Sequence, residues 1–132
     1  MARARKMDRC SIVDVATPAE AKAMAEAGAD AIIAHVGCTI GGSIGVKDAT
    51  VSMEDAVRAT QAIIDAGKTV RGDIIYLSHG GPILTPEDAA HINEHTDAVG
   101  FVGASSLERM AVEQPLTDLT REFKSIPVKR VH

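Results

Sequence analysis

Short apolar segments alternate with amphipathic segments along the chain. Four apolar runs with few polar positions cover residues 11–15, 29–36, 73–78 and 98–102. Such runs are typical of parallel strands that are covered on both faces. Residues 53–64 and 116–123 instead have apolar positions at helical spacing, which indicates helices with one buried face. The pattern predicts the order βαβαβαβα.

Three predicted helix starts share one arrangement, in which a hydroxyl residue precedes a carboxylate by three residues. Thr17, Ser52 and Thr85 are these hydroxyl residues, and each suits the N-cap because its side chain accepts a hydrogen bond from the first helical turn. Gly28 and Gly67 are expected just after two helix ends, where a left-handed residue is favoured.

The predicted fold is α/β, a parallel (βα)4 half of a TIM barrel. A closed eight-stranded barrel takes ~250 residues, whereas this chain has 132. The half-barrel is therefore expected to close only with a second half or in an oligomer. An open flavodoxin-like sheet, the C-terminal piece of a longer protein and a truncated reading frame are the alternatives. Residues 11–126 form the predicted unit, with a basic segment at 1–10 that is helical or frayed and a tail at 127–132.

Composition and charge exclude several classes of partner. The chain has 14 basic and 18 acidic residues, a net charge of −4, and one Tyr, two Phe and no Trp. No overall positive field attracts nucleic acid or anionic lipid, and no run approaches the ~18 apolar residues of a membrane span. We expect a cytoplasmic protein in which Cys10 and Cys38 are reduced thiols.

Two glycine-bearing connections follow the last two predicted strands, and both predict an anion site. His79 is followed by Gly80, Gly81 and Pro82 before the helix that starts at Thr85. The next connection contains the candidate phosphate ligands Gly103, Ala104, Ser105, Ser106 and Arg109. Backbone N–H groups and helix N-termini at such bends bind phosphate, and in barrels the last strand-to-helix loops are the usual place for it. The alternative is that the glycines only form tight turns and the serines only cap a helix.

His35 and His79 are the candidate catalytic residues. Each stands where a predicted strand ends, and imidazole exchanges protons near neutral pH. A structural histidine bonded to backbone is the alternative for each. Asp14, Asp48 and Glu108 are the carboxylates that would complete a metal site, with Mg²⁺ as the candidate ion, although the ligand set stays unknown. Cys38 is a weaker candidate nucleophile.

The connection at residues 37–51 is much longer than the usual ~2 to 6 residues of a strand-to-helix loop. Gly41, Gly42 and Gly45 lie within it, so it is a candidate lid that closes over a ligand. Thr39, Gly41, Gly42 and Lys47 are its candidate contacts with substrate. A surface loop without a role in binding is the alternative.

Three blocks of sequence resemble the phosphoenolpyruvate hydrolase-like TIM-barrel family: AEAGADAIIAHVGCTIGGSIG, IIYLSHGGPILTPEDA and GFVGASSLERMAVE. That family also occurs as the C-terminal domain of certain plant antiviral-resistance proteins. The resemblance runs from about residue 11 to residue 126 and implies a (βα)8 barrel, often in an oligomer. The sequence departs from the family pattern because the first half of the barrel is absent from it.

The resemblance and the candidate residues together predict a hydrolase or lyase. Its substrate would be a small phosphorylated or phosphono 2-oxo acid such as phosphoenolpyruvate or phosphonopyruvate, with the phosphate held by the last two loops. A non-catalytic module that senses phosphate or a nucleotide is the alternative. We expect no organic cofactor, no nucleic acid and no membrane partner, and a homo-oligomer or a second half-barrel as the protein partner.

Overall fold

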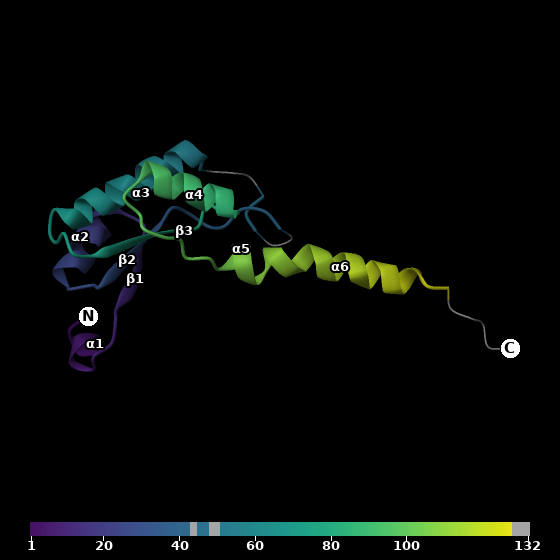
Figure 1. Ribbon diagram of the computed structural model, residues 1–132, viewed down its shortest axis with the longest axis horizontal. Coiled ribbons are helices and arrows are strands. Elements are labelled where there is room, and N and C mark those ends of the chain that lie inside the picture. Colours follow the sequence, from purple (N-terminus) through teal and green to yellow (C-terminus); the bar gives the residue numbers. More distant parts are fainter. Residues whose placement is uncertain (43–44, 48–50, 128–132) are drawn as a thin grey trace.

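The computed structural model describes residues 1–42, 45–47 and 51–127, and it has an α/β architecture (Figure 1). In chain order its elements are α1 (Ala2–Lys6), β1 (Ile12–Val15), α2 (Pro18–Glu26), β2 (Ala31–His35), α3 (Met53–Lys68), β3 (Ile75–His79), α4 (Pro86–His95), α5 (Ser105–Glu108) and α6 (Met110–Ser125).

Three parallel strands form an open sheet in the order β1-β2-β3. The prediction of a regular fourth strand is wrong, because residues 98–102 join the sheet only through an isolated bridge between Phe101 and Ser78. Hydrogen bonds still hold this segment beside β3: Ser78 N–H donates to Gly100 O and Val99 N–H donates to Tyr76 O, both at 2.9 Å. The open parallel sheet with its helices confirms the predicted half-barrel.

The predicted helix starts are confirmed, and one predicted helix end is wrong. Thr17, Ser52 and Thr85 each accept a hydrogen bond at the N-terminus of a helix. Gly28 follows α2 with φ +86°, as a left-handed helix end requires. Gly67 lies inside α3 instead, because the helix continues to Lys68.

Gly67 has a packing role that the sequence pattern did not reveal. It is buried in α3, and a Cβ at this position would lie 2.3 Å from Tyr76 Oη. The glycine therefore leaves the space into which the Tyr76 ring fits. Burial raises the pKa of Tyr76, whose hydroxyl has no hydrogen-bond partner among the described residues.

The main core lies between one face of the sheet and the helices α2 and α3. Val15, Ile32 and Tyr76 point from the three strands into this core, and each is at most 3% exposed. Ala21 and Ala25 of α2 and Ile63 and Ile64 of α3 complete it. Small residues on α2 allow the two helices to pack closely on the sheet.

The opposite face of the sheet is only partly covered in the described chain. Ile12 on β1 is 56% exposed and Ile75 on β3 is 52% exposed, whereas Ile33 on the central strand is 7% exposed. The register pairs place these three positions on the same face. The expectation that both faces are covered is therefore wrong for the outer strands.

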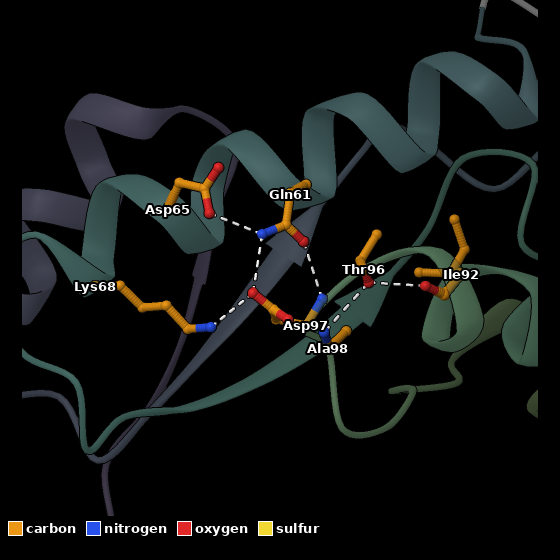
Figure 2. Close-up of polar contacts among 7 residues, drawn as sticks. All are labelled: Gln61, Asp65, Lys68, Ile92, Thr96, Asp97 and Ala98. Carbon is orange, nitrogen blue, oxygen red and sulfur yellow. Dashed lines mark hydrogen bonds and ion pairs between the residues drawn. The ribbon is translucent and has the colours of Figure 1, made fainter.

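A polar cluster fixes the turn that leads from α4 to the sheet edge (Figure 2). Asp97 accepts hydrogen bonds from Gln61 Nε2 at 3.0 Å and from Lys68 Nζ at 2.7 Å, and Asp97 N–H donates to Gln61 Oε1 at 2.9 Å. Thr96 Oγ1 donates to Ile92 O at 2.7 Å. These bonds attach the segment that enters the sheet to the outer surface of α3.

Helix α6 extends away from the rest of the molecule (Figure 1). Its predicted apolar stripe forms but is uncovered, because Leu116, Leu119 and Phe123 are 65%, 51% and 66% exposed. No helix within the described ranges is long and apolar enough to cross a membrane.

Candidate functional site

His35 and His79 end two neighbouring strands and face each other across the sheet. They are register partners in the β2–β3 pair, so both side chains lie on the same face. Their ring centroids are 4.8 Å apart, with an angle of 52° between the ring planes. The predicted pair of histidines is thus brought together, and both side chains are half-buried.

Backbone carbonyls define which ring nitrogen of each histidine carries a proton. His35 Nε2–H donates to Gly37 O at 2.9 Å, and His79 Nδ1–H donates to Val102 O at 2.6 Å. A carbonyl oxygen only accepts, so these two nitrogens must be the protonated ones. In the neutral rings His35 Nδ1 and His79 Nε2 are consequently the acceptors, and these are the atoms able to take a proton from a ligand.

Glycines allow the two strand exits to touch. Gly81 N–H donates to Gly37 O at 2.7 Å, and Val36 N–H donates to His79 O at 3.1 Å. A Cβ on Gly80 would lie 2.3 Å from Gly37 O and 2.8 Å from His35 Cδ2. Gly80 and Gly81 have φ of +78° and +57°, a region that side chains disfavour. The amide of Gly81, which the sequence suggested as an anion donor, is therefore bonded within the protein.

An open cleft of about 430 Å³ lies beside the histidine pair. Its walls come from the ends of β2 and β3, from the loop after β2 and from the start of α5. The residues that line it are His35, Cys38, Thr39, Gly45, Val46, His79, Ala104, Ser105 and Arg109. Two candidate catalytic residues and four candidate ligands, Thr39, Ala104, Ser105 and Arg109, thus share one cleft.

Arg109 connects the α5–α6 junction to the loop after β2. Its Nη1 donates to Glu113 Oε2 at 2.8 Å, and its Nη2 approaches Gly41 O at 3.4 Å. The side chains of Arg109 and Glu113 are 20% and 24% exposed, so the pair is well shielded from solvent. Arg109 supplies positive charge to the cleft and also holds this loop, which limits how freely it can reach a ligand.

The remaining candidate ligands do not line this cleft. Gly103 packs against Leu107, because a Cβ there would lie 2.4 Å from Leu107 Cδ1. Gly41 and Gly42 turn the loop with φ of +81° and +73°, and Gly42 leaves room for Arg109. Ser106 is half-buried in α5 and Lys47 is exposed.

The donor set for the candidate Mg²⁺ does not fit in the described part of the chain. Asp14 and Glu108 are exposed on β1 and α5, and Asp48 lies outside the described residues. Across residues 1–42, 45–47 and 51–127, no group of three or more His, Cys, Asp or Glu side chains is arranged to hold a metal ion. Cys38 is an exposed free thiol in the wall of the cleft.

Sequence reasoning missed the groups that orient the candidate residues. The carbonyls of Gly37 and Val102 fix the two imidazoles, and no residue type signals a carbonyl. Glu113 was also missed, although its position four residues after Arg109 is the usual spacing of a helical ion pair. Gly45 and Val46 reach the cleft because Gly41 N–H donates to Val46 O at 3.0 Å and closes the loop on itself.

Curated proteins from a plant and a bacterium are similar to this chain. Tomato (Solanum lycopersicum) proteins named ToMV susceptible protein tm-1(GCR26) and ToMV resistance protein Tm-1(GCR237) are each 53% identical over 113 residues, which is 85% of this chain and 15% of theirs. A putative transcriptional regulatory protein, y4pA, from Sinorhizobium fredii is 28% identical over 123 residues, 93% of this chain and 20% of its own length. The chain thus spans 15 to 20% of these relatives.

A solved structure and a family model also match this chain. The structure is titled as that of nitroalkane oxidase from Streptomyces ansochromogenes, and it matches with a TM-score of 0.53 and 31% identity over 80% of this chain and 30% of that one. The model described as phosphoenolpyruvate hydrolase-like matches residues 1–126. The chain therefore belongs to the phosphoenolpyruvate hydrolase-like family.

Proposed function

We propose that the cleft binds a small phosphorylated or phosphono 2-oxo acid, and that His35 and His79 transfer the protons of its hydrolysis. The observation that carries the proposal is the pair of facing imidazoles, each held by a carbonyl through one nitrogen and left with one acceptor nitrogen. Membership of the phosphoenolpyruvate hydrolase-like family supports the class of substrate.

The reaction requires a base and an acid on the same cleft. With phosphoenolpyruvate, one imidazole accepts a proton from water as the water oxygen attacks phosphorus and the P–O bond to the enol carbon breaks. The second imidazole, protonated beforehand, gives a proton to C3 of the enolate, and the products are pyruvate and phosphate. With phosphonopyruvate the same attack breaks the C–P bond, and the C3 carbanion takes the proton.

Charge and hydrogen-bond donors support the binding of an anion in this cleft. Arg109 supplies a cationic side chain to the lining of the cleft, and Thr39 and Ser105, which carry hydroxyl groups, line it as well. The partial burial of Arg109 strengthens its attraction for a phosphate oxygen. The loop at residues 37–51 is proposed as the cover of the bound substrate, with Thr39 as its contact; Lys47 would approach only if the loop moves.

Release of phosphate from phosphoenolpyruvate and from phosphonopyruvate tests the proposal. We expect His35→Gln and His79→Gln to lower kcat at least about 100-fold, which is the usual contribution of a general acid or base. His91→Gln is the matched control, because His91 lies on α4 with its ring against His95, and it should keep the wild-type rate. Unchanged turnover in His79→Gln would overturn the assignment.

A binding module without catalysis is the second candidate. The names of the relatives favour it, since they describe resistance and regulatory proteins in which this region is a small share of the length. Calorimetric titration with inorganic phosphate and with phosphoenolpyruvate separates the two candidates. Binding that Arg109→Gln weakens, without release of phosphate, supports the module.

The same preparations can be tested for consumption of nitroethane under air, because the similar solved structure is titled a nitroalkane oxidase. Turnover of nitroethane without turnover of either phosphorus compound would contradict the proposed substrate class.

A further inference from the structure

Two apolar surfaces of this chain have no cover among the described residues. The first, the exposed sheet face, consists of Ile12, Ile75 and the half-buried Leu77 on the two outer strands. Parallel sheets are covered on both faces in stable proteins, because their strands carry apolar side chains on both sides. The core with α2 and α3 uses only the other face.

The second surface, the α6 ridge, consists of five residues with coiled-coil spacing. Val112, Leu116, Leu119, Phe123 and Ile126 follow one another at steps of four, three, four and three residues. Each is between 51% and 66% exposed. The first four lie along one side of α6, and Ile126 follows as its C-cap residue with extended backbone. An apolar ridge of this kind is normally buried against a neighbour.

The sheet also has two unpaired edges in the described chain. The strand β1 pairs only with β2, and its other edge is open. At the opposite edge, residues 98–102 extend the sheet beyond β3. Helix α6 comes after this second edge in the chain and extends away from the body of the molecule (Figure 1).

We propose that a second copy of this chain covers both surfaces, and that the two half-barrels close face to face around a twofold axis. Each sheet edge at residues 98–102 then meets β1 of the partner, and the two exposed sheet faces share one interior. The α6 ridge of each copy packs over the junction with the partner. The proposal does not depend on what the cleft binds.

The strand count supports a second copy as the occupant. The described part of each chain supplies three strands and the segment 98–102, so two copies supply the eight strand positions of a closed barrel.

The apolar area is also sufficient for a stable dimer. Ile12, Ile75 and the five residues of the α6 ridge are each more than half exposed. Each of these seven side chains exposes on the order of 100 Å² of apolar surface, which gives about 700 Å² per copy. This area is close to the roughly 800 Å² that each partner buries in a stable interface. Asp14 is the charged residue on this face, and it lies toward the end near His35, where a barrel opens to solvent.

Sedimentation equilibrium of the full chain tests the proposal without reference to activity. We expect the wild type to have twice the monomer mass of 13.8 kDa. Leu119→Glu on the ridge and Ile75→Glu on the sheet face should each raise the dissociation constant of the dimer at least about tenfold, because each puts a charge into an apolar contact. Both positions are exposed in the single chain, so circular dichroism should show that the variants stay folded.

Arg121→Glu is the matched control, since Arg121 lies on the opposite side of α6 and is exposed. It should leave the dimer intact. A wild type that stays monomeric at every concentration overturns the proposal, and so does one that forms larger species without a discrete dimer. A dimer that Leu119→Glu dissociates and Ile75→Glu does not would show contact through α6 alone, which contradicts closure of the sheets.

Discussion

The helices α3 and α6 are both 16 residues long and amphipathic, yet only one of them has its apolar face buried in this chain. In α3, Ala56, Ile63 and Ile64 are at most 1% exposed. In α6, Leu116 and Phe123 are 65% and 66% exposed. The difference teaches that helical periodicity specifies which face a helix offers, whereas the partner of that face depends on the rest of the fold.

The N-termini of the two helices also differ, because only α3 has a capping hydrogen bond from a side chain. Ser52 caps α3 by accepting a hydrogen bond from Asp55 N–H at 3.1 Å. Helix α6 begins at Met110, its N-cap residue Arg109 makes no capping hydrogen bond through its side chain, and the helix follows directly on the short α5. The position of α3 is therefore fixed by its cap and by its core contacts, whereas that of α6 rests on the few contacts around Arg109.

Truncation of the apolar face should give the largest contrast between the two helices. Ile64→Ala in α3 is expected to lower the free energy of unfolding by about 2 to 5 kcal/mol, because it leaves a cavity in the core. Leu119→Ala in α6 should cost less than about 0.5 kcal/mol in the monomer, as an exposed site does. Urea denaturation of dilute protein measures both. Equal losses would contradict the assigned difference in burial.

Filling the space above Tyr76 should have the next largest effect. Gly67→Ala puts a methyl group against the tyrosine ring, and overpacking of this kind costs about 1 to 3 kcal/mol. Removal of the hydroxyl in Tyr76→Phe should recover part of that loss, so the two changes should be non-additive in a double-mutant cycle. If the two losses of stability are additive, the methyl group of Gly67→Ala does not contact the Tyr76 hydroxyl.

Loss of the cap of α3 should have a smaller effect. Ser52→Ala is expected to lower the free energy of unfolding by about 1 kcal/mol, because Asp55 N–H loses its acceptor. Ser52→Asn keeps an acceptor and should remain within a few tenths of a kcal/mol of the wild type. A loss as large in Ser52→Asn as in Ser52→Ala would indicate that another property of the serine matters.

The smallest expected effect concerns the attachment of α3 to the turn after α4. The hydrogen bonds from Lys68 and Gln61 hold the pKa of Asp97 below its usual range. A carboxylate with a lowered folded pKa stabilises the protein above its unfolded pKa of about 3.9, and this contribution is lost as the pH falls through the lower folded value. Asp97→Asn should therefore make the stability less dependent on acidic pH, measured by urea denaturation from neutral to acidic pH. An unchanged acid dependence would contradict this role.

Much of the fold was predictable because local signals agree with it. The hydroxyl caps at Thr17, Ser52 and Thr85 act on their own helical turns, so sequence alone was sufficient to find them. Gly67 was misassigned because a glycine near a helix end and a glycine under a distant ring look the same in sequence. Among the described residues no further strand lies on the outer side of the segment at 98–102, and its apolar residues alone did not make it a regular strand.

The candidate site was predictable in part for the same reason. His35 and His79 were placed at strand ends by the apolar runs before them, and parallel strands bring such ends together. Which glycines line the cleft was not predictable, because Gly80 and Gly81 turn toward Gly37 and Val36 rather than toward the cleft. The tautomers of the histidines depend on the positions of two carbonyl oxygens, which no sequence pattern encodes.

The contact of Gly37 with Gly80 and Gly81 also couples the two imidazoles mechanically. The bond from Gly81 N–H to Gly37 O joins the loop that follows His79 to the carbonyl that orients His35. A side chain introduced at Gly80 would push on Gly37 O and on the His35 ring at once. Changes at this crossing would therefore shift both imidazoles together, so substitutions that keep their arrangement should arise first in the surrounding wall of the cleft.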